Sequence, residues 1–391
     1  MAEQETLSVA IINRIYPPGK GITGESAAEL AKFFLSKDIK VNIVHVEAEY
    51  NGGHANATSY GSVHKVRTFY NGKGKLIRLF SSLYEGYKLI QKGKKLRADV
   101  IICMTDPPLL NFWAALLLPK NTKWMLWSMD IYPEAFIAGK LINANNFFYR
   151  LVDKEIKKNP PSHIIALGKY QAAMLHKKYG SSIGITILPC GIYDKNDNEN
   201  IATELPSWKK DDKIIIGYCG NLGEAHSTEF LASVIDNIDP NLFTVVLALY
   251  GSHASQMLKY AKGKEGVVII DNVKRKELKY IDIHLASLSE NWVNVSVPSK
   301  TVSSVCAGSS FLYHGVKTSD NWEILNNAGW IIEGNQIDEQ VKSFFSLINK
   351  EEIKQKKLNA SEVGTQLNTL KKEAFEEIYL QVKSLSRSSK S

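Results

Sequence analysis

Short runs of β-branched and other apolar residues alternate with longer stretches of helical periodicity along most of the chain. In the first half, residues 7–12 and 40–46 predict strands, and residues 26–35 predict a helix between them. Because successive strands are separated by enough chain for crossover helices, this half is expected to form a mostly parallel, doubly wound α/β sheet. The remaining strands of this half are expected at residues 100–104, 123–127, 163–167 and 185–188.

The alternation stops and then restarts in the second half of the chain. Residues 193–212 are rich in Asp, Asn, Lys, Pro and Glu and lack a periodic apolar pattern, which is typical of a linker. A length of 391 residues also favours two sizeable domains. Further strands are expected at residues 214–218, 243–250, 267–270, 284–288 and 310–313. We therefore expect a Rossmann-like first domain, a linker, a second Rossmann-like domain and a final helix with a frayed end, over residues 1–193, 194–212, 213–370 and 371–391.

The composition excludes several classes of protein. With 44% apolar and 23% charged residues, the chain is expected to be a folded globular protein rather than a disordered one. Its four cysteines are scattered and form no C-x-x-C pair, so neither a zinc site nor a disulfide framework is indicated. We see no secretory signal, and no apolar run approaches the ~20 residues that span a bilayer. We expect a cytoplasmic protein.

One basic segment, residues 73–97, contains eight Lys and Arg and a single acidic residue, Glu85. Its apolar residues recur at helical spacing, which predicts a basic amphipathic helix that could contact the inner, anionic face of the cytoplasmic membrane. The alternative is an ordinary surface helix whose apolar stripe packs into the core. A nucleic-acid binder is disfavoured, because no recognition module is present and a pI of about 9.0 is a weak signal.

In doubly wound sheets ligands bind beyond the carboxyl ends of the strands, so the turns there are informative. The glycine-rich turn 16–24 precedes a helix but matches neither G-x-G-x-x-G nor a Walker A motif, and alone it reads as a flexible loop. Asp130 follows another predicted strand. It is a candidate for binding a sugar hydroxyl or for proton transfer, and its alternative role is a helix N-cap.

Two turns of the second half are also candidates for binding an anion. Gly220 and Asn221 lie in a glycine-rich turn between a predicted strand and a helix. Ser299, Lys300 and Thr301 begin a helix, where backbone donors, two hydroxyls and an ammonium would suit a diphosphate leaving group without a metal. The alternative for this second turn is a capped helix with a solvated lysine.

Taken together, these segments resemble the GT-B glycosyltransferases, specifically the retaining family 4 in its bacterial surface-polysaccharide branch. The resemblance runs over most of the chain and depends on the order and spacing of short motifs. In the first half these are residues 17–24, 29–31, 105–108, 130–134 and 187–191. In the second half they are residues 218–223, 225–229, 297–300, 307–308 and 328–333, and the closing helix 373–385 matches one that typically returns toward the first domain.

The resemblance implies a nucleotide-sugar donor held by the second domain, a saccharide or polyprenyl-linked glycan acceptor held by the first, and transfer with retained anomeric configuration. Neither a metal nor a cofactor is expected. Lys300, Asp130 and Glu323 are the implied catalytic residues. The implied donor-binding residues are Gly24, approaching from the opposite wall, Val273 beside the base, and Gly220, Asn221, Ser299, Lys300, Thr301 and Ser303.

This chain departs from the family at two acidic positions. Ser303 stands where a glutamate usually binds the ribose hydroxyls, and Val295 stands where the other acid of the family's E-x7-E pattern would lie. Donor affinity is therefore expected to be low, unless Glu290 or Glu323 serves instead. A catalytically silent GT-B homologue that binds a glycan or a partner transferase remains an alternative. A sugar-nucleotide 2-epimerase is disfavoured, because its acid and histidine set is not found.

Overall fold

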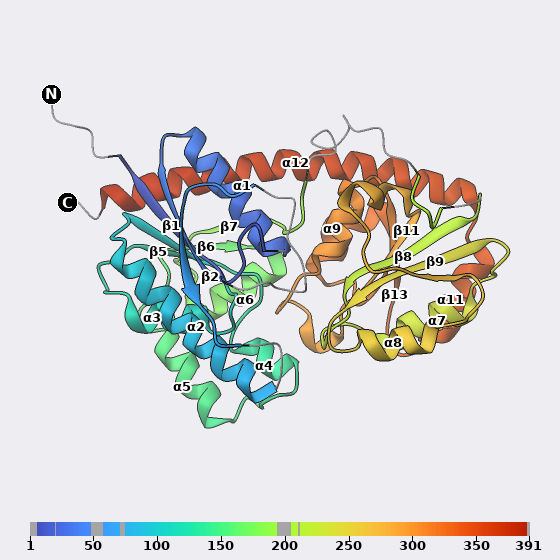
Figure 1. The fold of residues 1–391 in the computed structure, drawn as a ribbon, viewed down its shortest axis with the longest axis horizontal. Helices are drawn as coiled ribbons and strands as arrows, with labels where there is room; N and C mark the ends of the chain where they lie inside the picture. Colours follow the sequence, from blue (N-terminus) through green and yellow to red (C-terminus); the bar gives the residue numbers. More distant parts are fainter. Residues whose placement is uncertain are drawn as a thin grey trace. The chain divides into compact units, whose positions relative to one another are not determined.

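The computed structural model divides the chain into two compact units, each with a sheet flanked by helices (Figure 1). Unit 1 comprises Met1–Cys190 and Lys372–Ser391, and unit 2 comprises Gly191–Lys371. Most of the predicted linker lies outside the described residues. The structure describes residues 6–19, 21–47, 58–70, 75–193, 205–209 and 212–388.

The sheet of unit 1 has the strand order β3-β2-β1-β4-β5-β6-β7, and all of its pairings are parallel. The order reverses between the neighbours β1 and β4, which is where doubly wound sheets bind ligands. The strands are β1 (Ser8–Ile12), β2 (Lys40–Glu47), β3 (Ser62–Arg67), β4 (Val100–Cys103), β5 (Trp124–Trp127), β6 (His163–Ala166) and β7 (Ile185–Ile187).

The helices of unit 1 connect these parallel strands. Both α1 and α2 contact β2, and α3 contacts α2 and α5. The helices are α1 (Ile22–Ser36), α2 (Lys75–Lys95), α3 (Leu110–Leu117), α4 (Glu134–Ala138), α5 (Phe147–Ile156) and α6 (Lys169–Tyr179).

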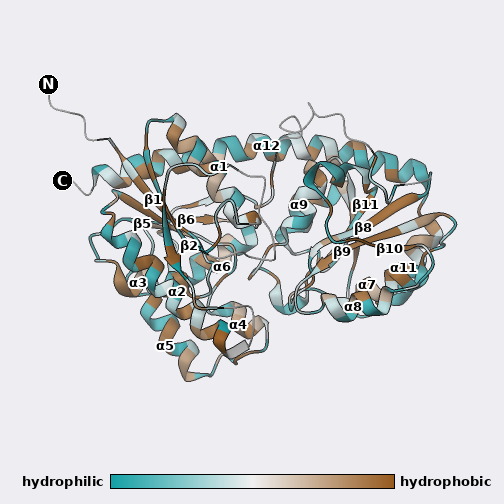
Figure 2. Cartoon of the chain, viewed as in Figure 1, coloured by the Kyte–Doolittle hydropathy of each residue, from teal (hydrophilic) through white to brown (hydrophobic). Residues whose placement is uncertain are grey.

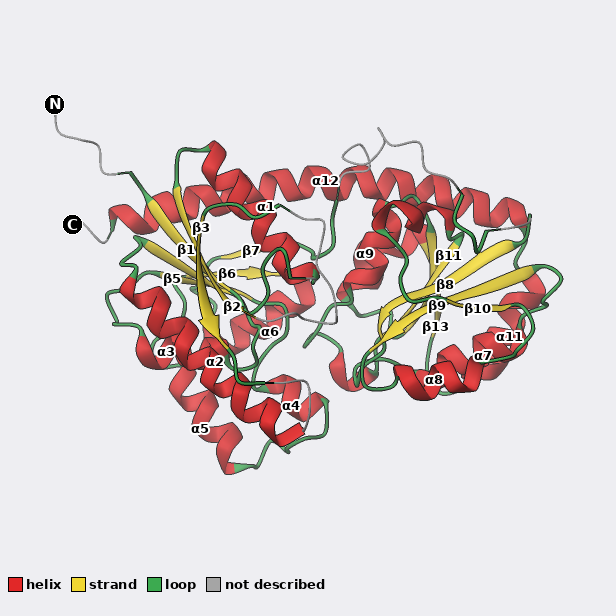
Figure 3. Ribbon diagram, in the orientation of Figure 1, coloured by secondary structure: helices red, strands yellow, loops and turns green. Residues whose placement is uncertain are grey.

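Unit 2 has a second parallel sheet, with the order β10-β9-β8-β11-β12-β13 and a reversal between β8 and β11. Its strands are β8 (Ile214–Asn221), β9 (Phe243–Tyr250), β10 (Val267–Ile269), β11 (Ile283–Ser287), β12 (Ser310–His314) and β13 (Gly329–Ile332). Its helices are α7 (Thr228–Asn237), α8 (Ala254–Ala261), α9 (Ser299–Cys306), α10 (Asp320–Leu325) and α11 (Ile337–Leu347), with short 3-10 turns η2 (Arg275–Tyr280), η3 (Glu290–Trp292) and η4 (Asn326–Ala328) (Figure 3).

The expected doubly wound α/β architecture is confirmed in both units. Each predicted strand is present, with ends that differ from the prediction by three residues at most. Strands β3 and β13 were not predicted. β3 is an edge strand whose side chains are mostly exposed, so it lacks the apolar run of a buried parallel strand.

The cores lie on the faces of the sheets, most of whose strands are coloured as hydrophobic in Figure 2. In unit 2, one buried cluster includes Phe230 and Val341 and packs on one side of the sheet. Another buried cluster, which includes Val302, Phe311 and Ala360, packs α9 and the first part of the long C-terminal helix against the sheet. Helices therefore cover this sheet on both faces, as a doubly wound fold requires.

The C-terminal helix α12 (Lys350–Arg387) contributes to both units and includes the predicted final helix. Beyond residue 371 it packs within unit 1: the rings of Phe375 and Phe33 lie 5.3 Å apart, and Ile378 and Val382 are fully buried. Within the described ranges, no helix has the length and apolarity needed to cross a membrane.

The packing of this final segment predicts a contrast between two neighbouring positions. Ile378 is 0% exposed and Leu380 is 59% exposed. Ile378→Ala should lower the free energy of unfolding by about 2–5 kcal/mol, because it removes buried methyl groups and leaves a cavity. Leu380→Ala is the matched control and should change it by less than about 0.5 kcal/mol. Urea denaturation measures both, and equal effects would contradict the packing.

Candidate functional site

Lys300, on the first turn of α9, is the centre of a polar cluster at the carboxyl edge of the unit 2 sheet. Its Nζ lies 3.1 Å from the Tyr218 hydroxyl, 2.5 Å from the Asn221 carbonyl oxygen and 3.2 Å from Nε2 of His226. It also lies 4.6 Å from the centre of the Tyr218 ring. The cluster joins the start of α9 to the end of β8 and to the loop that follows.

His226 presents a neutral acceptor to Lys300. Its Nδ1 donates a hydrogen bond to the Ser287 carbonyl oxygen at 2.7 Å, which leaves Nε2 free to accept from the lysine. Burial, and then the neighbouring Lys300, lower the pKa of His226 to about 3. Burial also lowers the pKa of Lys300 to about 7. The ammonium is thus surrounded by neutral groups and would gain from an added negative charge.

The glycine-rich turn holds its shape through two positions that require glycine. Gly220 has φ of 121°, and a Cβ there would lie 3.1 Å from Cε of Lys300. Gly251, with φ of 109°, leaves room for the side chain of Asn221, which would clash with a Cβ at that position. Gly220, Asn221 and Lys300, predicted as separate elements of a donor site, therefore lie together.

The helices α7 and α9 differ in how their first turns are capped. The hydroxyl of Ser227 caps α7 by accepting from the Phe230 N–H at 3.0 Å. At α9 the N-cap is Pro298, which has no side-chain hydrogen bond to the helix. An uncapped helix N-terminus presents backbone donors and a partial positive charge, so α9 is the better anion site of the two.

The two hydroxyls predicted beside Lys300 differ in accessibility. Ser299 is partly exposed, whereas Thr301 is fully buried and donates to the Pro298 carbonyl oxygen at 3.2 Å. Asn321, at the start of α10, donates to the same carbonyl at 2.8 Å and holds α10 against α9. The hydroxyl of Thr301 is therefore engaged inside the unit and does not point to a ligand.

The remaining predicted donor residues, Val273 and Ser303, supply no carboxylate. Val273 is half-buried beside a small apolar cluster that includes Ile215 and Val246. Ser303 donates to the Gly191 carbonyl oxygen at 3.1 Å, and Val295 is buried. The two acids considered as substitutes, Glu290 on η3 and Glu323 on α10, are exposed.

In unit 1, polar residues gather where β1, β4 and β5 end. Arg14 follows β1, Asp106 follows β4 and Asp130 follows β5. The Arg14 N–H donates to the Asp106 carbonyl oxygen at 2.6 Å, and the Asp130 N–H donates to the hydroxyl of Thr105 at 3.1 Å. Burial raises the pKa of the Asp106 carboxyl to about 6, although Arg14 opposes this shift.

A buried ion pair supports this edge. Nε of Arg14 lies 3.2 Å from Oε2 of Glu85, and the hydroxyl of Ser81 donates to Oε1 of the same carboxylate at 2.8 Å. Thr68 donates to that oxygen as well. The pair fixes Arg14 beside the end of β1.

Gly24, the other unit 1 residue predicted to approach the donor, lies in the first turns of α1. A Cβ there would come within 3.0 Å of the Ile15 carbonyl oxygen, so the close packing of α1 on the preceding loop favours glycine. Trp124 and Trp127, the first and last residues of β5, are fully buried core residues.

Three residues of these clusters had no predicted role: Arg14, Asp106 and Asn321. His226 lies two residues before α7, and its ring faces Lys300. Only Asp106 carried a sequence signal, since it belongs to the motif 105–108. The others need the fold to be recognised.

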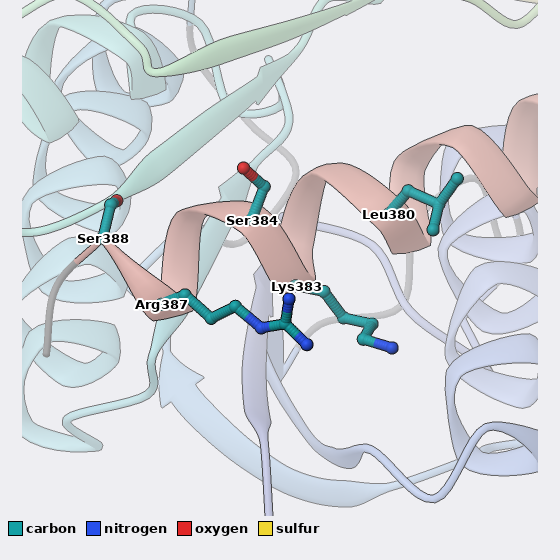
Figure 4. A pocket seen from close by; sticks show the side chains of 5 residues that line it. All are labelled: Leu380, Lys383, Ser384, Arg387 and Ser388. Atoms are coloured by element: carbon teal, nitrogen blue, oxygen red, sulfur yellow. The ribbon is translucent and has the colours of Figure 1, made fainter.

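A cavity of about 570 Å³ lies on the last turns of α12 (Figure 4). Lys383 and Arg387 extend from the same side of the helix in this view. None of the predicted site residues lines it, and its lining comes from a single helix. We therefore place the candidate site at the sheet edges and not here.

Comparisons with known proteins give a distant relative. No family model matches the chain. The probable glycosyltransferase WbjE of Pseudomonas aeruginosa is 21% identical over 269 residues, which span 65% of this chain and 66% of the relative. The match thus leaves about a third of each protein uncompared.

Solved structures identify the fold. WaaG, a glycosyltransferase involved in lipopolysaccharide biosynthesis, superposes with a TM-score of 0.66 and 13% identity over 95% of this chain and 99% of its own. Anabaena HepE, in a complex with UDP and glucose, gives 0.65 and 12% identity over 95% and 99%. Two doubly wound units with these likenesses define the GT-B fold, the architecture of a large class of glycosyltransferases.

The neutral state of His226 predicts a pH dependence of stability. Its pKa falls from 6.5 to about 3 on folding, so the unfolded chain binds a proton that the native chain does not between these values. Stability contributed by the neutral ring is complete above pH 6.5 and is lost as the pH falls toward 3. His226→Gln should reduce the slope of the unfolding free energy between these pH values.

Urea denaturation of wild type and variant across this pH range measures the difference in slope. A constant offset at every pH is expected from the lost hydrogen bond to Ser287 and is not the prediction. Parallel curves would show that the ring of His226 is not held neutral in the native state.

Proposed function

We propose that the chain is a retaining, metal-independent glycosyltransferase of family 4. It moves a sugar from a nucleotide-sugar donor to a saccharide or lipid-linked acceptor in bacterial surface polysaccharide or glycan synthesis. The observation that carries the proposal is Lys300, an ammonium at an uncapped helix N-terminus whose hydrogen-bond partners among the described residues are all neutral. Such an arrangement of donors can bind an anion.

A diphosphate fits this site because the charge of a leaving nucleoside diphosphate develops where the donors point. Lys300, the first backbone N–H groups of α9 and the turn at Gly220 are held in place before the ligand binds, so little reorganisation is needed. The phosphates would raise the lowered pKa of Lys300 and keep the lysine charged. Val273 would contact the base, and Ser303 the ribose. Support also comes from HepE, whose structure holds UDP and glucose.

The acceptor would bind unit 1, where Asp130, Asp106 and Arg14 offer both acceptors and a donor to sugar hydroxyls. We assign the acceptor contact to Asp130, as the sequence predicts, and add Asp106 because its raised pKa allows it to donate near pH 6. A lipid-linked acceptor would place the chain at the cytoplasmic face of a membrane, with residues 73–97 in contact with it.

A second candidate is a catalytically silent homologue that binds a glycan or a partner transferase. The specific observation in its favour is the absence of a carboxylate at both family positions: Val295 belongs to the core, and Ser303 bonds to the backbone at Gly191. Binding of nucleotides separates the two functions.

The first experiment is a thermal-shift screen against UDP, GDP, CDP, dTDP and ADP and their sugar conjugates, first without metal and then with Mg²⁺. Selective stabilisation by one base without metal is expected, because a ligand that binds only the native state raises the melting temperature. Stabilisation that depends on Mg²⁺ would contradict metal independence. No shift at millimolar ligand would favour the silent homologue.

Lys300→Ala tests the role of the ammonium in turnover. Removing a donor to the leaving group should lower turnover by roughly 10²-fold or more, by analogy with the loss of an oxyanion donor, while the melting temperature stays nearly unchanged. Lys342→Ala, at a lysine that is 64% exposed in the same unit, is the matched control. Unchanged turnover in Lys300→Ala would overturn the assignment.

A further inference from the structure

The N-terminal half of α2 buries its polar side and exposes its apolar side. Ser81, Ser82 and Glu85 are buried, whereas Phe80 is 63% exposed and Ile77 is 48% exposed. Glu85 faces inward because it pairs with Arg14 and accepts from Ser81. Because opposite sides of a helix face in opposite directions, burial of the side with Glu85 leaves these apolar residues facing outward.

The C-terminal half of α2 forms a basic groove with the edge strand β3. The groove has a volume of about 510 Å³. Its cations are Lys65 and Arg67 from β3, and Lys88, Lys92 and Lys95 from α2. One acid, Glu47, pairs with Lys65 at 3.3 Å, so the groove keeps an excess of positive charge.

These features follow one another along α2 in a definite order. Exposed apolar residues come first, with Ile77, Leu79 and Phe80. The exposed tyrosines Tyr84 and Tyr87 come next, and the lysines of the groove follow. Across a membrane interface, apolar groups lie deepest, tyrosines lie at the boundary and lysines lie among the headgroups.

A second apolar surface lies near α5 in the same unit. Leu141 is 73% exposed and Phe147 is 78% exposed, with Phe148 and Leu151 also exposed. Arg150 and Lys154 accompany them on α5. Because α3 contacts both α2 and α5, the two surfaces belong to one layer of helices.

We propose that α2 and α5 dock the chain on an anionic lipid bilayer. The exposed apolar residues of α2 and Phe147 enter the interfacial layer, and the basic groove binds lipid phosphates. Arg78, which is exposed in the apolar half of α2, extends its guanidinium to the headgroups. The docking rests on the membrane contact of the proposed function and adds which residues make that contact and which end of α2 lies deepest in the bilayer. It does not depend on whether the chain transfers a sugar.

A bilayer fits this surface better than a soluble polyanion. An acidic polysaccharide would satisfy the five cations of the groove but would leave Phe80, Ile77 and Phe147 exposed to water. Charge complementarity and apolar burial are both satisfied only by a surface that offers phosphates above hydrocarbon.

Vesicle co-sedimentation of the full chain, without donor, tests the proposal. The vesicles are phosphatidylcholine alone or with about 30% phosphatidylglycerol, at salt from about 50 to 300 mM. Wild type should bind the anionic vesicles at least 10-fold more tightly. The variant Lys88→Gln/Lys92→Gln/Lys95→Gln should lose roughly 10²-fold at low salt and most of the salt dependence. The variant Ile77→Ser/Phe80→Ser should lose at least 10-fold at every salt concentration.

Matched controls separate this surface from general effects. Lys317→Gln/Lys342→Gln/Lys354→Gln removes three lysines of unit 2 that are 63%, 64% and 70% exposed. Leu347→Ser removes an apolar residue of unit 2 that is 72% exposed. Both should bind vesicles like wild type, and all variants should keep the wild-type melting temperature.

Three results would overturn the docking proposal: no binding of wild type to anionic vesicles, full binding by Ile77→Ser/Phe80→Ser, or equal losses in the controls. Displacement from vesicles by dextran sulfate, with no effect of Ile77→Ser/Phe80→Ser, would assign the groove to a soluble polyanion instead. The nucleotide screen is independent of these results, so failure of docking and failure of the proposed transferase can be told apart.

Discussion

Every strand pairing in the described part of both sheets is parallel, and this places all carboxyl ends of a sheet at one edge. In unit 2 the constraint brings Lys300 into contact with residues 74 to 82 positions earlier in the chain. In unit 1 it gathers Arg14, Asp106 and Asp130, each of which follows a different strand. Both candidate sites depend on this edge, since no local segment contains either of them.

The sequence predicts the sheets well because buried parallel strands are continuous apolar runs. It predicts poorly the elements whose side chains are mostly exposed. β3 carries Lys65 and Arg67 and has one buried position, Val66, because among the described strands it is the last of its sheet and pairs only with β2. The long α12 shows a clear apolar stripe over its final turns, and its earlier turns are more polar, so only the end of the helix is recognised. In both β3 and the earlier turns of α12, the exposed side chains are polar, so the apolar pattern that marks a buried strand or helix is missing.

The candidate site shows the same limit at the level of side chains. Val302 and Val305 anchor α9 in the core, and Lys300 lies on the opposite side of the helix. Which side of α9 faces the core can be derived from the sequence, because the apolar residues recur at helical spacing. The burial of Thr301 follows less directly, because it depends on Asn321 of α10 reaching the Pro298 carbonyl. The meeting of His226 and Lys300 depends on β8 and α9 sharing an edge, which requires the strand order.

The helix α2 shows why periodicity alone leaves the buried face undecided. Its apolar and polar residues separate into two sides, and a rule that buries the apolar side would place Phe80 in the core. In the first half of the helix the side that carries Glu85 is buried instead, and Phe80 is exposed. A carboxylate buried beside Arg14 gains a charge partner and two hydroxyl donors. The apolar side chains opposite stay exposed, with Ile77 at 48% and Phe80 at 63%. The ion pair that holds Arg14 at the end of β1 therefore also determines which surface of the unit is apolar.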